Sequence, residues 1–356
     1  MQYRPFGKLD FQVSALGFGA MRLPSSKGKV KEKEAIEMIR YAIDHGVNYI
    51  DTAYPYHDGE SEIVVGKALQ DGYRDKVKLA TKMPVWKVDS ASDFDLYLNE
   101  QLEKLSVDHI DFYLLHSLNE KSWPIIRDLG VLDRFTEPIA DGRIGYPGFS
   151  FHADLDTFKN IVDAYDWAMC LIQHNYMNVN YQAGRTGLRY AAKKGLAVAI
   201  MEPLLGGNLA IPPAPVQAIW DQAENKRDAV ELAMQWLWNQ PEVSTVLSGM
   251  STMEQLVENI RYAAKSNVGL LTPEELELYD EVRERYDALT AIPCTACGYC
   301  MPCPQNVDIP QNLANYSNGV RYDKYELVRG KYIWWELAYK NQKFFSHDIR
   351  AVNCTA

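Results

Sequence analysis

The strongest constraint on the fold is a regular alternation of short apolar segments with longer amphipathic ones between about residue 12 and residue 250. Eight segments have the apolar, β-branched pattern of buried strands. They are residues 13–19, 47–53, 76–82, 109–116, 144–150, 169–175, 196–202 and 243–249. A helical pattern or a loop follows each one, which is typical of a parallel sheet covered by helices. Eight such units predict an α/β fold of the (β/α)8 TIM barrel type.

A doubly wound α/β sheet is the alternative arrangement of the same elements. That fold is expected to carry a G-x-G-x-x-G turn after its first strand. The sequence "GFGAMR" at this place contains only G-x-G. The barrel is therefore favoured.

Composition excludes several classes of function. The chain has 356 residues, is 47% hydrophobic and carries a formal net charge of −10. Such a chain can bury a large core but would repel a nucleic-acid backbone. We see neither a targeting segment nor an apolar run of about 18 residues, the length that a membrane span requires. We therefore expect a cytoplasmic protein that binds neither nucleic acid nor a membrane.

The pattern changes after about residue 267, where a charged helical segment precedes a cysteine cluster and an aromatic-rich tail. We predict two domains, the barrel over residues 1–270 and a small α-helical, cysteine-rich module over residues 271–356. A module of fewer than about 100 residues has little core of its own. A bound metal or docking onto the barrel would be a plausible source of its stability.

Four polar residues stand at or just after three successive predicted strand ends: Asp51, Tyr56, Lys82 and His116. In a barrel, such residues converge on one face. Each taken alone is as well explained by a turn, a helix cap, packing or a solvated surface. Their joint occurrence favours a shared catalytic function.

This set of side chains suits the reduction of a carbonyl group. Hydride delivery to the carbon leaves negative charge on the oxygen, which must be protonated or held by donors. The tyrosine hydroxyl could supply the proton, although its ordinary pKa is near 10. The lysine ammonium favours the tyrosinate form, the aspartate fixes the lysine, and the histidine could donate to the substrate oxygen.

Three segments together resemble the aldo-keto reductase family: residues 46–69, 76–84 and 102–117. The resemblance covers roughly residues 1–265. It implies a TIM barrel and NAD(P)H-dependent reduction of a small-molecule aldehyde, ketone or quinone to an alcohol. It further implies that Tyr56 is the general acid, that Lys82 and Asp51 tune it, and that His116 binds the carbonyl oxygen. We expect Trp86, His57 and His152 to line the substrate pocket.

The same resemblance implies where NADPH or NADH would bind. The implied contacts are Gly19, Met21, Asp51, Ser150, Gln173, Leu205, Gly207, Leu209, Gly249, Gln255, Glu258 and Asn259. Many relatives carry basic residues in the segment 249–259, which grip the 2′-phosphate of NADPH. This chain has neither Lys nor Arg there. We expect weak discrimination for NADPH over NADH, or a basic residue supplied from elsewhere.

The cysteine cluster has the form C-x2-C-x2-C-x2-C-P, with Cys294, Cys297, Cys300 and Cys303. The bacterial ferredoxin run has three residues before its last cysteine, so this is a near match. Four thiolates suit a 4Fe-4S cluster or a zinc ion. The tail resembles that of an aldo-keto reductase branch with paired cysteine motifs. A structural role for the cluster is favoured over electron transfer to a partner, because nicotinamide passes hydrides. Cys354 near the chain end repeats the "CTA" of the cluster, so we expect a truncated second motif and an incomplete ligand set.

A second hypothesis treats the barrel as a nucleotide-binding, redox-sensing regulatory module without turnover. The presence of all four candidate catalytic residues favours the enzyme.

Overall fold

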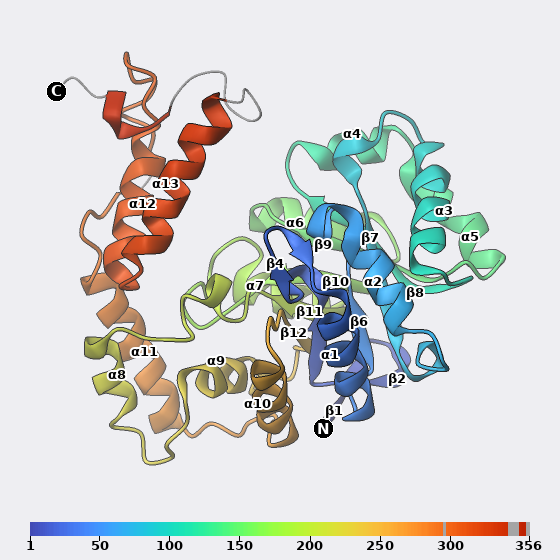
Figure 1. Ribbon diagram of the computed structural model, residues 1–356, viewed down its shortest axis with the longest axis horizontal. Coiled ribbons are helices and arrows are strands. Elements are labelled where there is room, and N and C mark those ends of the chain that lie inside the picture. The colour runs from blue at the N-terminus through green and yellow to red at the C-terminus, as the bar shows by residue number, and fades with distance from the viewer. Residues whose placement is uncertain (295–296, 341–348, 354–356) are drawn as a thin grey trace. The chain divides into compact units, whose positions relative to one another are not determined.

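The computed structural model describes residues 1–294, 297–340 and 349–353 (Figure 1). The chain forms two compact units. The first contains residues 1–206 and 230–271, and the second contains residues 207–229 and 272–356. The sequence predicts that all of residues 1–270 belong to the barrel. The structure instead groups residues 207–229 with the C-terminal part of the chain.

The first unit is built on a closed barrel of parallel strands. Around the barrel the strands follow the order β10, β11, β12, β3, β6, β7, β8, β9. Their bounds are β3 (Leu16–Gly19), β6 (Tyr49–Asp51), β7 (Lys78–Met83), β8 (Ile110–Leu118), β9 (Ile144–Phe151), β10 (Met169–Gln173), β11 (Ala197–Met201) and β12 (Thr245–Ser248). Each lies within or overlaps one of the eight segments predicted from the sequence. The TIM-barrel prediction is confirmed, and the doubly wound alternative is excluded.

An antiparallel hairpin closes the end of the barrel at which the strands begin. It consists of β1 (Tyr3–Phe6) and β2 (Leu9–Ser14). Phe6 packs in the barrel core, and its ring lies 4.9 Å from that of Phe112. Lys8 N donates to Gly195 O, two residues before β11. The predicted strand 13–19 joins the last two residues of β2 to β3, because the break at Ala15 leaves no change in the apolar pattern.

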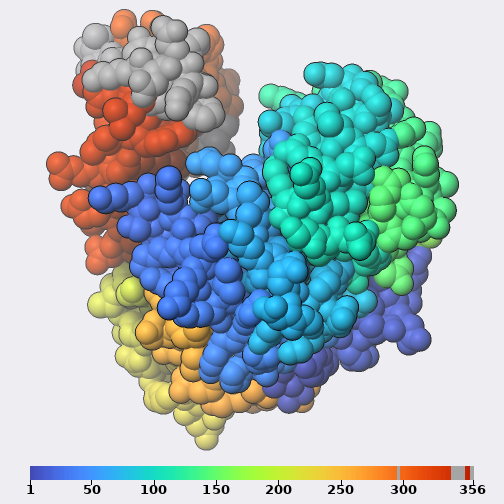
Figure 2. Space-filling model, turned by 45° about the vertical axis from the view of Figure 1, so that its right-hand side comes forward, coloured from blue at the N-terminus to red at the C-terminus, as the bar shows by residue number. Residues whose placement is uncertain are grey.

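Amphipathic helices and short 3-10 turns connect the strands and cover the barrel. In α1, the buried residues Ala35, Met38, Ile39 and Ala42 repeat at the helical period and form one apolar face. Figure 2 shows the surface over α1 and α2 in blue beside that over α3 and α4 in teal. The bounds are α1 (Glu32–Asp44), α2 (Glu60–Ala68), α3 (Asp93–Leu105), α4 (Ser122–Asp128), α5 (Thr136–Ala140), α6 (Leu155–Ala164), α7 (Gly184–Lys193), α9 (Ala229–Trp238), α10 (Met253–Ala264), η1 (Ala20–Arg22), η2 (Tyr56–Gly59), η3 (Arg74–Lys76), η4 (Val85–Lys87), η5 (Val131–Phe135), η6 (Leu205–Gly207), and a small hairpin of β4 (Ser25–Ser26) and β5 (Lys29–Val30).

The second unit is helical. It contains α8 (Ala214–Trp220), α11 (Pro273–Ala288), α12 (Ile309–Arg321), α13 (Tyr325–Lys340) and η7 (Ala351–Asn353). The rings of Trp220 and Tyr279 meet edge to face at 4.8 Å, and Arg227 bonds Glu275 at 2.6 Å. These contacts explain why residues 207–229 group with α11. None of the helices in the described ranges is long and apolar enough to cross a membrane.

The predicted cysteine ligands lie in this second unit. Cys294, Cys297 and Cys300 are exposed and Cys303 is half-buried. Among the residues that the structure describes, no three His, Cys, Asp or Glu side chains gather in a way that could hold a metal ion. Cys354 lies outside the described residues. A cysteine-bound metal therefore stays a prediction.

Candidate active site

The four candidate catalytic residues come together at the end of the barrel where the strands finish. Asp51 is the last residue of β6, Lys82 is the next-to-last of β7, His116 lies in the last third of β8, and Tyr56 begins η2. Parallel pairing of β6 with β7 aligns Asp51 with Ala80, so Lys82 extends just past the end of β6. This register brings the carboxylate and the ammonium to the same level of the barrel.

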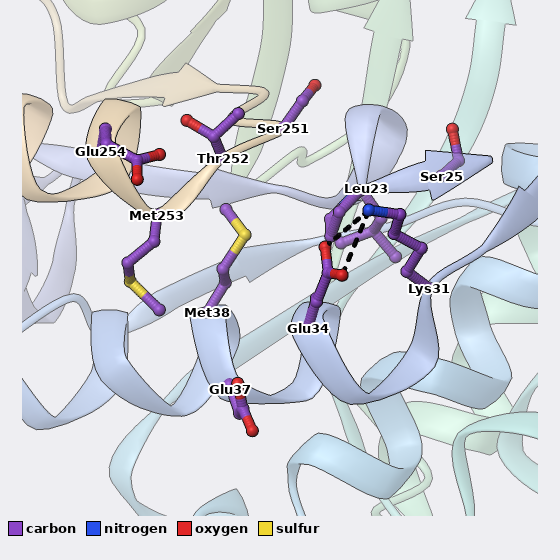
Figure 3. A pocket seen from close by; sticks show the side chains of 11 residues that line it. Leu23, Ser25, Lys31, Glu34, Glu37, Met38, Ser251, Thr252, Met253 and Glu254 are labelled. Carbon is purple, nitrogen blue, oxygen red and sulfur yellow. Dashed lines mark hydrogen bonds and ion pairs between the residues drawn. The ribbon is translucent and has the colours of Figure 1, made fainter.

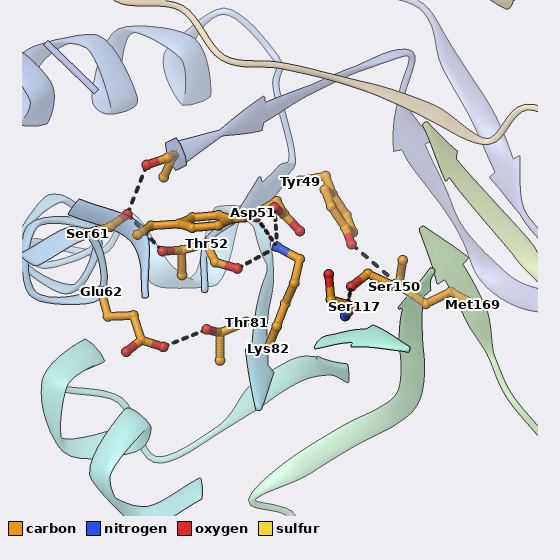
Figure 4. Close-up of polar contacts among 12 residues, drawn as sticks. Tyr49, Asp51, Thr52, Ser61, Glu62, Thr81, Lys82, Ser117, Ser150 and Met169 are labelled. Carbon is orange, nitrogen blue, oxygen red and sulfur yellow. Dashed lines mark hydrogen bonds and ion pairs between the residues drawn. The ribbon is translucent and has the colours of Figure 1, made fainter. Parts of the chain in front are cut away.

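The ammonium of Lys82 is the centre of the site (Figure 4). It donates to Asp51 Oδ1 at 2.5 Å, to Thr52 O at 2.7 Å and to the Tyr56 hydroxyl at 3.3 Å. A lysine has three donors, and all three are used. The side chain is 0% exposed. Burial with three acceptors fixes this charge at one point beside the tyrosine.

The Lys82–Asp51 pair is ionised. Burial alone would lower the pKa of Lys82, but the charge of Asp51 and the contact with Tyr56 outweigh it and raise the pKa. Burial raises the pKa of Asp51, and the ammonium opposes that shift. We take the carboxylate as charged, because a 2.5 Å contact is that of a charge-assisted hydrogen bond.

Tyr56 is protonated at neutral pH. Burial raises its pKa, and the lysine charge lowers it by a smaller amount, so the net shift is upward. From the sequence, only the lowering of this pKa by the lysine is expected. The raised pKa leaves the hydroxyl in the form that can donate a proton.

His116 is a neutral imidazole beside Tyr56. Burial first, and then the charge of Lys82, lower its pKa to about 2. Its ring meets the Tyr56 ring edge to face with centroids 5.9 Å apart. Within the described residues, its buried Nδ1 has no hydrogen-bond partner, nor does Asp51 Oδ2. Buried polar atoms without partners are rare, so these two are candidates for bonding to a bound molecule.

The predicted substrate-pocket residues differ in their placement. Trp86 packs against His116 with ring centroids 5.2 Å apart and is half exposed, as a pocket wall would be. His57 instead accepts a hydrogen bond from Leu23 N at 3.1 Å. His152 contacts Gln182 at 3.4 Å. Both histidines therefore have protein partners in this structure.

Three of the expected cofactor residues make buried or strand contacts at the barrel mouth. Gly19 pairs with Asp51 across β3 and β6. Ser150 Oγ accepts from Ser117 N at 2.7 Å, and Asn259 Nδ2 donates to Ser248 Oγ at 3.0 Å. The remaining expected cofactor residues lie in different surroundings. Gln173 is the last residue of β10 and Leu205 lies in η6, whereas Met21 and Glu258 are exposed. Gly207 and Leu209 belong to the second unit.

The segment 249–259 begins beside a basic side chain that the sequence analysis did not identify. A Cβ on Gly249 would lie 3.1–3.2 Å from the side-chain carbons of Arg22. The Arg22 guanidinium continues toward Gly206, where a Cβ would lie 3.7 Å from Nη2. Gln255 is turned back on the start of α10, where its side-chain oxygen accepts from Ser251 N at 2.9 Å.

Two polar atoms at this mouth are available to bind a ligand. Asp51 Oδ2 and His116 Nδ1 are buried and have no hydrogen-bond partner among the described residues, while the Arg22 side chain occupies the space beside Gly249. These features fit a polar ligand bound next to Lys82 and Tyr56.

A separate cavity of about 420 Å³ lies beside α1 (Figure 3). It is lined by α1, by the loop after η1 and by residues 251–254 at the start of α10. Lys31 in this cavity is paired with Glu34 at 3.1 Å. None of the four candidate catalytic residues lines it.

Comparison with known proteins identifies the family. The model of the "Aldo/keto reductase family" matches residues 15–284. A probable aldo-keto reductase 1 from Glycine max is 33% identical over 162 residues, which are 43% of this chain and 45% of that protein. An NADH-specific methylglyoxal reductase from Escherichia coli is 26% identical over 73% of this chain and 93% of its own length.

A solved structure agrees with this result. The holo form of an aldo-keto reductase from Bacillus halodurans superposes with a TM-score of 0.67 and 26% identity, over 79% of this chain and 96% of its own. The chain therefore belongs to the aldo-keto reductase family and is an NAD(P)H-dependent oxidoreductase.

Proposed function

We propose that this enzyme reduces the carbonyl group of a small aldehyde, ketone or quinone to an alcohol, with Tyr56 as the proton donor. The observation that carries the proposal is the fully buried ammonium of Lys82, which touches both Asp51 and the hydroxyl of Tyr56. A buried ammonium beside a tyrosine hydroxyl can assist proton transfer, whereas it does not improve the packing of the core.

The side chains have complementary tasks in this reaction. A nicotinamide cofactor, when bound, would supply the hydride that reduces the carbonyl carbon. As negative charge develops on the carbonyl oxygen, Tyr56 donates its hydroxyl proton to it. Lys82 stabilises the tyrosinate that remains, and Asp51 holds Lys82 in position. The neutral imidazole of His116 donates an N–H to the same oxygen and orients the carbonyl. Trp86 forms an apolar wall beside it.

Tyr56→Phe removes the proton donor and keeps the ring. We expect kcat for carbonyl-dependent NAD(P)H oxidation to fall at least about a hundredfold, because general acid catalysis is lost. Cofactor affinity, measured by fluorescence titration, should stay within about twofold. Tyr54→Phe is the matched control, since the Tyr54 hydroxyl bonds Glu100 instead of Lys82. A wild-type protein that binds the cofactor but turns over no aldehyde or quinone would favour the redox-sensing alternative.

The pH dependence of kcat for reduction should reflect the ionisation of the Tyr56 hydroxyl alone. The tyrosine must be protonated, and burial raises its pKa from the ordinary value. We therefore expect kcat to be constant from pH 5 to 8 and to fall only as the pH rises through the pKa of Tyr56. His116 contributes no limb in this range, because it stays neutral. A profile of kcat at saturating cofactor checks this, with circular dichroism at each pH to confirm folding. An ionisation near pH 6.5 that disappears in His116→Gln would contradict it.

We propose that the enzyme discriminates weakly between NADPH and NADH. The segment 249–259 contains neither Lys nor Arg, and Gln255 is engaged in capping α10. The E. coli relative is described as NADH-specific. The side chain of Arg22 lies beside Gly249 at the start of this segment, and its guanidinium extends toward Gly206.

Gln255→Arg should add the missing phosphate contact. We expect the affinity for NADPH relative to NADH to rise about tenfold, the effect of one new charge-assisted hydrogen bond. Dissociation constants of both cofactors measure it. Gln70→Arg, near the opposite end of the barrel beyond α2, carries the same charge change as a control. A wild-type preference for NADPH above about a hundredfold would refute weak discrimination.

We propose further that the cysteines of the second unit are metal ligands, with a 4Fe-4S cluster favoured over zinc. The support is their spacing in the sequence, since the described side chains do not gather into a ligand set. The carbonyl chemistry above involves none of these thiols.

Metal analysis of protein prepared without oxygen tests this assignment. We expect iron and acid-labile sulfide in similar amounts, lost in Cys300→Ser because a thiolate ligand is removed. Cys170→Ser is the control, since Cys170 is fully buried in the barrel. Zinc without sulfide would overturn the cluster, and the absence of any metal would overturn the site.

A further inference from the structure

A second buried polar cluster lies behind the catalytic lysine. It consists of Glu62 from α2, Thr81 from β7, Gln101 from α3 and Tyr113 from β8, and we call it the Glu62 cluster. All four residues are 0% exposed. None of them was identified from the sequence, and the proposed reaction does not use them directly.

The contacts of the Glu62 cluster lead to the backbone of Lys82. Thr81 Oγ1 donates to Glu62 Oε1 at 2.6 Å, as Figure 4 shows, and Gln101 Nε2 donates to the same oxygen at 2.5 Å. Gln101 Nε2 also lies 3.1 Å from Lys82 O. Tyr113 OH donates to Gln101 Oε1 at 2.8 Å and fixes the amide from the other side. The Glu62 carboxyl group therefore holds in place Thr81, which precedes Lys82 in β7, and Gln101, whose amide lies beside the carbonyl oxygen of Lys82.

The neighbouring residue on α2 fixes the other side of the ammonium. Ser61 Oγ lies 2.9 Å from Thr52 Oγ1 and donates to Ala20 O at 3.0 Å. Thr52 in turn supplies the carbonyl that accepts from Lys82 Nζ. The first turn of α2 is therefore bonded to the strand that carries Lys82 and to the segment that receives its ammonium.

A carboxyl group buried at this position carries a large desolvation cost. Burial raises the pKa of Glu62, and the hydrogen bonds from Thr81 and Gln101 only partly oppose the shift. Within the described part of the chain, Glu62 Oε2 has no hydrogen-bond partner. An apolar side chain would fill the space without this desolvation. A costly buried group next to a catalytic residue indicates a role in function more than in stability.

We propose that Glu62 is a positioning residue for carbonyl reduction. Its carboxyl holds Thr81 and Gln101, and through them the backbone of Lys82, so that the ammonium stays between Asp51 and the Tyr56 hydroxyl. The inference rests on the proposed roles of Lys82 and Tyr56. It predicts that loss of the carboxyl oxygen disturbs the tyrosine through the lysine, without any direct contact between Glu62 and substrate.

Two substitutions of Glu62 distinguish the effect of its acceptor oxygen from that of its negative charge. Glu62→Gln keeps an acceptor for Thr81 and Gln101 and should retain kcat within about threefold. Glu62→Leu keeps the volume but removes the acceptor. We expect it to lower kcat at least about tenfold, with KM and cofactor affinity changed by no more than about twofold. A displaced Lys82 lowers the pKa of Tyr56 less, so that pKa should rise by about half a unit or more.

The pKa of Tyr56 is measured by NMR of protein labelled at the tyrosine Cζ, with Tyr56→Phe for assignment. This readout does not depend on turnover. An enzyme without Tyr56-dependent reduction would refute the proposed function, while the pKa comparison would still decide the positioning role. If Glu62→Leu fails to fold, Thr81→Val removes one donor of the cluster and should shift the same pKa upward.

Asp111→Asn is the control for a general loss of stability. Asp111 is a buried carboxylate near the start of β8 that accepts from Arg74 and Lys78, at the opposite end of the barrel. Its substitution should lower the free energy of unfolding but leave kcat and the pKa of Tyr56 unchanged. An unshifted pKa in Glu62→Leu and Thr81→Val, or an equal shift in Asp111→Asn, would overturn the proposal.

Discussion

The arrangement of the barrel mouth depends on one buried charge, the ammonium of Lys82. Taking such a group out of water costs several kcal/mol unless it is paired and fully hydrogen-bonded. Asp51, the carbonyl of Thr52 and the Tyr56 hydroxyl supply the three acceptors. They come from β6 and the loop after it, while the lysine comes from β7. The parallel register of β6 and β7 keeps these groups at the same level of the barrel, and residues of the hairpin β1–β2 pack in its core.

The backbone at this mouth is held in conformations that L-residues rarely adopt. His57 and Asp58 after Tyr56, Ser117 after His116 and Glu202 after β11 all have positive φ. Each costs of order 1 kcal/mol and persists only where the surroundings impose it. For Ser117 the imposing contact is its N–H bonded to Ser150 Oγ. Ser117 lies within β8, where the pairing with β9 is irregular between Leu115 and Leu118, and the other three positions lie in η2 or directly after β11.

The sequence was a good guide to the strands and to the four candidate catalytic residues, and a poor one to their supports. Strands and helices follow from the period of apolar side chains, which is local. Glu62 lies in "GESEIVV", where an acid at the start of a helix normally means a solvated cap, so burial could not be inferred. Arg22 stands some 230 residues from Gly249, and only folding brings the two together. The grouping of residues 207–229 with α11 depends on contacts such as Trp220 with Tyr279, which no local pattern encodes.

The sequence by itself determined the barrel, because alternating apolar segments have few other ways to bury both faces of a parallel sheet. It also determined which functional groups stand at the strand ends, because the places of Asp51, Lys82 and His116 in the sequence put a carboxylate, an ammonium and an imidazole there. The tertiary structure alone decided their protonation. Burial makes His116 neutral and keeps Tyr56 protonated, and the Asp51 contact keeps Lys82 charged. Those states depend on desolvation and on charges brought from distant parts of the chain, which a linear sequence does not specify.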